Sequence, residues 1–430
     1  MQNKLHLSSM VLGYISLFLA LAAFIFWINK EAFFTLGSLP KRHGYLAFAL
    51  KVFSGIALWL VYTYYYTNRI DADIYKYFDD AAHLFKSTQN DWMLRLKLIT
   101  GFQNDLEIKS FLSGTNFWDS ESELFFNDNR TIIRIHLALC HLSGGLYLFH
   151  VIFFSFISFI GSTALFHFFN RNVTLPNWVL FICCFCVPSV LFWASAPLKE
   201  SLIIFGLGTL LFGIQRVKER MNTHSILWLT IGLLNLLSLK NYILFAFLPG
   251  LWFWLTTTGK TNRSIQVKFL WIHFLLGLFL FSNKVIQALE QKQLQFKALI
   301  EKNGANSAIG LNSFDSTLSL IYTIPQALFN VLIIPFYPVN WSPFSLFNGI
   351  EHIIFLSLIF FPFIYKKRLL EGEQRLVLIC VSFLVVGSCI IGLTVPVVGG
   401  IVRYKGPLIP SYLIAILTFT NFSKIAQKLK

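Results

Sequence analysis

The feature that most constrains this fold is a series of apolar segments, most of about 17 to 25 residues, that recur along the 430-residue chain. A helix of that length crosses the roughly 30 Å hydrocarbon core of a bilayer. Only 13% of the residues are charged and the mean hydropathy is +0.63, whereas a soluble domain has about 25% charged residues. The segments do not alternate apolar and polar residues, as the strands of a membrane barrel do. The sequence therefore predicts an all-α polytopic membrane protein.

We expect about 11 to 13 transmembrane helices in a single transmembrane domain that covers residues 1–430. Eleven segments are placed as spans, at 8–28, 44–66, 144–168, 176–194, 199–215, 224–239, 241–257, 266–284, 348–365, 376–394 and 406–421. Two more apolar segments are ambiguous, because 131–143 is too short to cross alone and 318–337 runs into several prolines. The first segment is interpreted as an anchor, since it lacks a small-residue cleavage site.

The basic residues predict how the chain is oriented. Short loops rich in Lys and Arg stay on the cytoplasmic side, and the basic clusters fall on one side if 318–337 dips into the membrane or lies at its surface. The outer side then receives two large loops, 67–130 and 285–347. If 131–143 crosses instead, the early topology is inverted. The net charge of +15 is thus read as a topology signal of a bacterial-type inner (plasma) membrane protein, and no nucleic-acid partner is expected.

The predicted outer loop 67–130 carries 11 of the 20 acidic residues of the chain. We expect amphipathic helices in it. It opens with two pairs of carboxylates and two tyrosines, namely Asp71, Asp73, Asp79, Asp80, Tyr75 and Tyr77. On a helix, Asp73, Tyr77 and Asp80 share one face. A carboxylate here could act as the general base for an acceptor hydroxyl, and a divalent metal could bridge the aspartate pairs; the alternative is a solvated acidic first turn of a helix.

Several charged residues at span ends are candidates for binding an anionic substrate at the membrane surface. They are Lys199 and Glu200 at the start of one span, Lys240 between two spans, Arg403, Tyr404 and Lys405 before the last span, Glu351 early in another, and Arg134 in the segment 131–143. Lysine binds phosphate as a point charge and arginine binds it through two parallel hydrogen bonds. Snorkelling, local ion pairs and an interfacial helix are the alternatives without function.

Four motifs together resemble the GT-C superfamily of polyprenyl-phosphate-sugar-dependent membrane glycosyltransferases. They are D-x-D-x-Y-x-Y-F-D-D at the start of the first large outer loop, P-S…K-E-S-L in a span pair, P-x-A-L…P-F…W…E from Pro325 to Glu351, and R-Y-x-x-P-x-x-P from Arg403 to Pro410. The resemblance implies a polyprenyl-linked sugar donor, a glycan or lipid acceptor, membrane lipids as surroundings, and a catalytic carboxylate at Asp71 or Asp73. In the family this loop usually follows the first span, whereas here it follows the second.

The sequence thus favours a membrane glycosyltransferase of cell-surface glycan or glycolipid synthesis, with Lys199, Lys240, Arg403 and Lys405 around the departing phosphate. Two alternatives stay open: a surface-polysaccharide polymerase of the O-antigen or capsule type, and a transporter or flippase of a lipid-linked sugar. A carrier predicts charges near the bilayer midplane, while this chain concentrates them at one face. No Walker loop or dinucleotide fingerprint is present, so no soluble nucleotide cofactor is expected.

Overall fold

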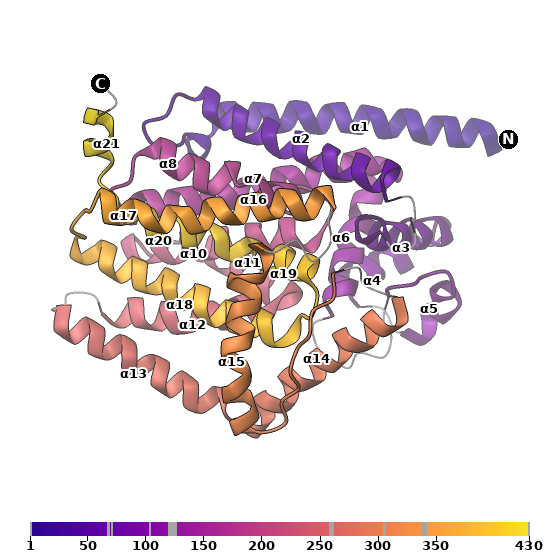
Figure 1. Cartoon of the computed structure of the whole chain (residues 1–430). Coiled ribbons are helices and arrows are strands. Elements are labelled where there is room, and N and C mark those ends of the chain that lie inside the picture. The colour runs from indigo at the N-terminus through magenta and orange to yellow at the C-terminus, as the bar shows by residue number, and fades with distance from the viewer. Residues whose placement is uncertain are drawn as a thin grey trace. The chain divides into compact units, whose positions relative to one another are not determined.

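The fold is seen in a computed structural model that describes residues 2–66, Arg69, 72–102, 105–118, 127–257, 262–303, 307–336 and 342–428. Within these residues there are many helices, two isolated β-bridges and no strand (Figure 1). The predicted all-α class is confirmed for them. The prediction that falls on Asp71, and on the side chain of Asp73, lies outside the described residues.

Six helical segments among the described residues are long and apolar enough to cross a membrane. They are the part Val11–Lys30 of α1 (Gln2–Lys30), α2 (Arg42–Tyr64), α7 (Tyr147–Asn172), α10 (Lys199–Glu219), the segment Pro343–Ile364 formed mainly by α16 (Pro343–Ser357) and α17 (Phe361–Ile364), and α18 (Glu371–Thr394). A seventh span results if α13 (Asn262–Leu280) and α14 (Asn283–Asn303) cross as one, since together they are long and apolar enough, although they are bent by 71° at the break between them. These helices agree with a multi-pass membrane protein.

Shorter apolar helices occupy other predicted spans. They are the segment Asn177–Cys186, α11 (Thr223–Leu239), α12 (Asn241–Thr256) and α15 (Thr317–Leu332). Sixteen residues, the length of α12 and α15, rise about 24 Å, which is less than the hydrocarbon thickness. The expected count of 11 to 13 spans, the side on which each loop lies and the single domain over 1–430 therefore stay predictions.

The chain divides into two compact units. The first consists of Met1–Phe168, Cys184–Cys186 and Leu191–Asn241, and the second of Phe169–Cys183, Val187–Val190 and Tyr242–Lys430. The predicted span 176–194 is interrupted: α8 (Asn177–Phe181) continues into a π-helical turn, Ile182–Cys186, and α9 (Pro188–Trp193) starts anew. Pro188 has no N–H to donate to a carbonyl one turn earlier, so an uninterrupted helix through this point is disfavoured.

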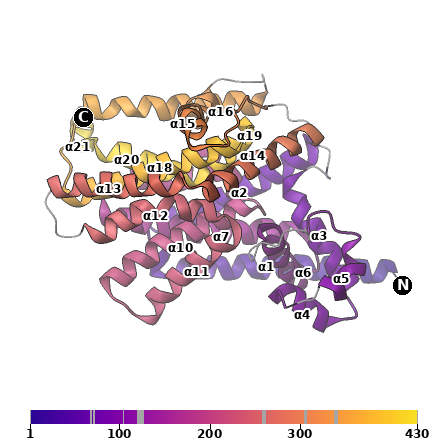
Figure 2. The ribbon, with the colours of Figure 1, turned by 90° about the horizontal axis from the view of Figure 1, so that it is seen from below.

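In the first unit, glycines let long helices approach closely. A Cβ added at Gly232 of α11 would collide with the backbone of Leu210 in α10, and one at Gly208 of α10 would collide with the backbone of Gly161 in α7. Small residues at such crossings allow the backbone contacts that hold membrane helices together. Figure 2 shows α7, α10 and α11 as neighbours. The helix α10 thus packs closely against both α7 and α11.

The predicted loop 67–130 is largely helical where it is described. It contains α3 (Asp73–Ser87), α4 (Trp92–Thr100) and α5 (Asp105–Leu112), and is followed by α6 (Asp128–Ser143). These helices group together in both views (Figures 1 and 2). Their shared core includes Leu84 of α3, Leu98 of α4 and Leu137 of α6, all fully buried. The expected helices in this loop are confirmed, and the apolar segment 131–143 proves to be most of α6.

The second unit is built on α18. Its Gly392 lies against the backbone of Ala327 in α15, and α14 and α20 (Ile409–Thr418) also pack on α18. Two short helices, α19 (Val398–Tyr404) and α21 (Phe422–Lys428), flank α20. Buried Phe314, Leu320 and Leu393 belong to one apolar cluster of this unit.

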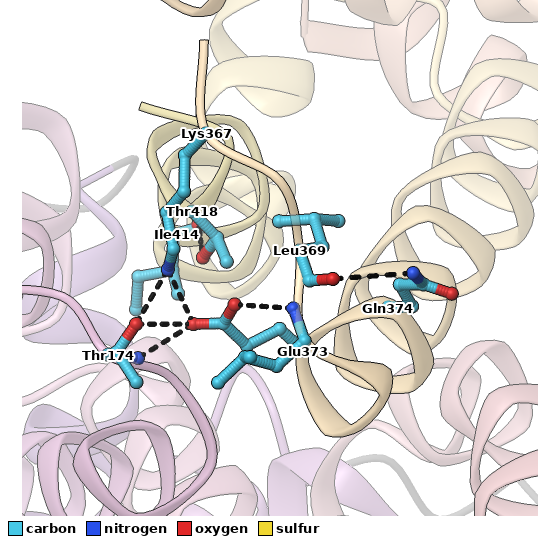
Figure 3. Close-up of polar contacts among 8 residues, drawn as sticks. Thr174, Lys367, Leu369, Glu373, Gln374, Ile414 and Thr418 are labelled. Atoms are coloured by element: carbon cyan, nitrogen blue, oxygen red, sulfur yellow. Dashed lines mark hydrogen bonds and ion pairs between the residues drawn. The ribbon is translucent and has the colours of Figure 1, made fainter. Parts of the chain in front are cut away.

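A carboxylate at the start of α18 ties three segments of the second unit together (Figure 3). Glu373 Oε1 accepts hydrogen bonds from the Thr174 backbone N–H at 2.9 Å, the Thr174 hydroxyl at 2.7 Å and Lys367 Nζ at 2.7 Å. Its Oε2 accepts from the Leu370 N–H at 3.0 Å. The Glu373 side chain is only 2% exposed. A buried charge satisfied by four donors is an anchor for the surrounding segments.

Replacing Glu373 by Ala is therefore expected to destabilise the protein by about 3 kcal/mol, since it leaves Lys367 without its carboxylate partner and the Thr174 donors without their acceptor. The measurement is the thermal unfolding midpoint of the purified protein in detergent, which we expect to fall by several degrees. Glu371→Ala, in the same first turn but exposed, is the matched control and should leave the midpoint unchanged. Equal midpoints for the two variants would contradict the anchoring role.

Candidate functional site

Three charged side chains from three elements of the first unit meet at the start of α6. Asp128 Oδ2 lies 2.8 Å from Lys199 Nζ and 3.0 Å from Lys240 Nζ. The neighbouring Asn129 Oδ1 accepts a further hydrogen bond from Lys199 Nζ at 2.6 Å. Two of the lysines that the sequence predicted to bind phosphate thus converge on one carboxylate oxygen.

The tight turn before α10 fixes the position of Lys199. The hydroxyls of Ser195 and Ser201 donate to the backbone carbonyls of Leu191 and Ala196. The Ser155 hydroxyl of α7 donates to the Ser195 carbonyl at 2.7 Å. Because α10 begins directly after this hydrogen-bonded turn, Lys199 lies in its first turn.

The other two charged residues are also placed by helix ends. Lys240 is the C-cap of α11, and its backbone N–H donates to the Leu236 carbonyl at 3.0 Å. Asp128 is the first residue of α6, after the N-cap Asn127. The Asn127 side chain accepts from the N–H groups of Asn129 and Arg130. A carboxylate in the first turn of a helix is favoured by the helix dipole.

The two lysines are more buried than the acid that pairs with them. The exposed fractions of the side chains are 5% for Lys199, 22% for Lys240 and 32% for Asp128. Burial alone would raise the pKa of the Asp128 carboxyl, but the charges of Lys240 and Lys199 outweigh it and hold this pKa well below its usual range. The buried Glu200 adds a second negative charge that acts on Lys199. Asp128 is thus an ionised group between two cations.

Tyr77 of the acidic segment reaches this cluster. Lys199 Nζ lies over the ring of Tyr77, 4.8 Å from its centroid. Tyr77 follows Asp73 by one turn of α3, so this contact places the first turns of α3 beside Lys199. The acidic segment thus contacts, through Tyr77, one of the lysines that the sequence predicted to bind phosphate.

The other predicted residues of the acidic segment whose side chains are described, Tyr75, Asp79 and Asp80, have partners within the protein. Asp79 accepts two hydrogen bonds from the Arg69 guanidinium, at 2.6 and 2.9 Å. Arg69 also lies 3.8 Å over the ring of the buried Tyr75, whose hydroxyl is 2.6 Å from the Thr63 hydroxyl. These contacts hold the start of α3 to the end of α2.

Asp80 accepts hydrogen bonds from two backbone N–H groups, those of Asn116 at 2.9 Å and Phe117 at 2.7 Å. It is 1% exposed. Burial raises the pKa of this carboxyl, while the backbone hydrogen bonds oppose the rise. A carboxylate with both oxygens bound to a loop backbone is explained by its anchoring role. On α6, Arg134 lies 5.5 Å over the ring of the buried Trp118.

The second unit brings together Glu351, Lys405 and a histidine that the sequence did not assign. The His352 Nε2 atom is 2.6 Å from the Leu332 carbonyl oxygen, which can only accept, so Nε2 carries the hydrogen. His352 Nδ1 then accepts from Lys405 Nζ at 3.3 Å. Glu351 accepts from the Ser189 N–H at 2.8 Å. All three side chains belong to residues less than 8% exposed.

The remaining candidates of the second unit, Arg403 and Tyr404, directly precede Lys405 in the sequence. The Tyr404 carbonyl accepts from the Tyr242 hydroxyl at 3.2 Å, and Arg403 lies half-buried in the last turn of α19. Burial lowers the pKa of Lys405 to about 8, although the negative charge of Glu351 opposes the change. Lys405 therefore loses its charge closer to neutral pH than an exposed lysine does.

Asp128 is the functional candidate that sequence reasoning missed. The run Asn127-Asp128-Asn129 before an apolar segment is typical of a helix start, and it could have placed Asp128 at a helix N-terminus. Lys51 of α2 was also not anticipated. It is 1% exposed and donates to the Ser158 hydroxyl of α7 at 2.8 Å. In the part of the chain that is described, no three His, Cys, Asp or Glu side chains are placed to hold a metal ion.

Comparison with known proteins gives no relative: no protein-family model, curated protein or solved structure matches this chain. The resemblance to the GT-C superfamily therefore rests on its four sequence motifs.

Proposed function

We propose that the chain is a membrane glycosyltransferase that uses a polyprenyl-phosphate-linked sugar donor in cell-surface glycan or glycolipid synthesis. It would act at the extracytoplasmic face of a bacterial-type inner membrane. The observation that carries this proposal is the convergence of Lys199 and Lys240 on one carboxylate oxygen of Asp128.

A phosphate fits the chemistry of this cluster. Two ammonium groups that already share one anionic oxygen are arranged to share an oxygen of a phosphate in the same way. Both lysines lie at ends of apolar helices, at the start of α10 and the end of α11. The phosphate of a polyprenyl lipid lies at the end of its hydrocarbon chain, so a site at helix ends suits a lipid-linked donor better than a soluble one.

The transfer itself needs a base and a stabilised leaving group. The acceptor hydroxyl oxygen attacks the anomeric carbon of the donor sugar, and its proton passes to Asp71 or Asp73. The bond between the anomeric carbon and the phosphate oxygen breaks, and polyprenyl phosphate leaves with the bonding electrons. Lys199 and Lys240 stabilise the negative charge that develops on this phosphate, and preorganised charges are most effective at that point.

In the second unit, we propose that Lys405 and Arg403 bind an anionic group of a substrate. Lys405 must be an ammonium ion to do so. With a pKa of about 8, it loses this charge as the pH rises through that value. The transfer rate is therefore expected to fall on the alkaline side of pH 8.

Two variants test this pH dependence through kcat/KM, measured from about pH 6.5 to 9.5. In Lys405→Met the alkaline fall assigned to Lys405 should disappear, with a lower rate at neutral pH. In Lys405→Arg the charge persists throughout the range, so the fall should disappear while more of the neutral rate is kept. An unchanged alkaline fall in both variants would exclude Lys405 as its origin.

The proposed function is tested by supplying donors to the purified protein in proteoliposomes. The donors are polyprenyl-monophosphate hexoses and, separately, a polyprenyl-diphosphate oligosaccharide. We expect acceptor-dependent release of polyprenyl phosphate from a monophosphate donor. Consumption of the diphosphate donor alone would indicate a polymerase, and movement of intact donor across the bilayer without bond cleavage would indicate a transporter. Either of these results overturns the proposal.

A further inference from the structure

Among the described residues, the charged groups that act on Lys199 balance in sign. Lys199 and Lys240 contribute two positive charges, and Asp128 and Glu200 contribute two negative ones. Lys199 and Glu200 are both less than 5% exposed. Adding a phosphate to this neutral group would leave uncompensated negative charge away from water, which is costly. A phosphate can therefore bind both lysines only if one of the two acids leaves.

Asp128 is the acid that can leave. Its side chain is 32% exposed, and it is short and stands at the first position of α6. Rotation about its first side-chain bond turns the carboxylate away from the lysines while the helix backbone stays in place. Glu200, by contrast, is 3% exposed in the first turn of α10. Its side chain is therefore far more buried than that of Asp128.

We propose that the Asp128 carboxylate occupies the phosphate position in the empty protein and is displaced by the phosphate of the donor. This inference rests on the proposed function. Asp128 Oδ2 takes hydrogen bonds from both lysines, at 2.8 and 3.0 Å, and a phosphate oxygen in its place receives the same two donors. The N-terminus of α6 favours an anion at this position as well. Asp128 thus keeps the lysines paired until the donor arrives and lowers the affinity for phosphate by competing for the site.

The test is the binding of farnesyl phosphate to the full-length protein in nanodiscs at about pH 7. An internal competitor leaves the site free for only a fraction of the time, and removing it raises the apparent affinity by the reciprocal of that free fraction. If the Asp128 carboxylate holds the phosphate position about 90% of the time without the probe, Asp128→Asn is expected to bind the probe about tenfold more tightly than the natural protein. Lys199→Gln and Lys240→Gln are expected to bind it more weakly. Glu371→Gln, which removes one exposed negative charge in the second unit, is the matched control.

The outcomes separate this inference from the proposed function. Suppose that Asp128→Asn binds the probe equally or more weakly, while the two lysine variants bind it more weakly. Displacement of the Asp128 carboxylate is then overturned, but phosphate binding by the two lysines is still supported. Unchanged binding by both lysine variants overturns the phosphate site itself, and the inference with it. Should Asp128→Asn fail to fold, Asp128→Ser gives the same test, because serine also lacks the competing charge.

Discussion

Replacement of Lys199 by Gln is expected to lower the rate of sugar transfer by about 10²–10³-fold, the cost of removing one preorganised donor from a developing anion. The Lys199 ammonium is almost completely buried and contacts Asp128, Asn129 and the Tyr77 ring. Glutamine keeps much of the volume but removes the charge. The loss should appear in both kcat and kcat/KM, since the charge on the phosphate grows in the transition state.

Two further variants give this prediction its controls. Lys240→Gln should also lower the rate of sugar transfer, but by a smaller factor. The Lys240 side chain is 22% exposed, so water replaces part of its contribution. Lys218→Gln changes an exposed lysine at the opposite end of α10, and it should keep the natural rate. Equal losses in Lys199→Gln and Lys218→Gln would show that the charge at position 199 has no special role.

The largest effect is expected when the two proposed base candidates are removed together. The double variant Asp71→Asn, Asp73→Asn should lose about 10²–10⁴-fold in kcat, the usual contribution of a general base. Binding of farnesyl phosphate should be unchanged, because the lysines that hold the phosphate are intact. The measurement compares single-turnover transfer rates with probe affinity in the same preparations.

The matched control for the double variant is Asp315→Asn, which changes an exposed carboxylate in the other predicted outer loop. It should transfer sugar at the natural rate. Activity of the double variant close to that of the control would remove the acidic segment from the mechanism. In that case the base must be sought elsewhere, and Asp128 would be the first candidate in the first unit.

The long helices could be predicted from the sequence because apolar length is a local property. The predicted span 199–215 begins at the observed start of α10, and 224–239 and 376–394 end where α11 and α18 end. Breaks inside apolar segments were harder to predict. The segment 176–194 looks continuous in hydropathy, yet Pro188 and the π-helical turn divide it.

The site was only partly predictable, because its contacts join residues far apart in the chain. Lys199 and Lys240 stood out as charges at span ends, and the structure brings them together. Their partner Asp128 did not stand out among the 11 acidic residues of its loop. Asp80 shows the reverse case: it belonged to a conspicuous acidic motif, yet its carboxylate binds the backbone of residues 116 and 117. No local pattern distinguishes such an anchor from a substrate ligand.

The central claim, that Lys199 and Lys240 hold the phosphate of a lipid-linked donor, is tested most directly by an experimental structure with polyprenyl phosphate in nanodiscs. We expect phosphate oxygens within about 3 Å of both Nζ atoms, a normal hydrogen-bond distance, with the Asp128 carboxylate turned away. A structure in which the phosphate is bound elsewhere, and both lysines still contact Asp128, would contradict the claim.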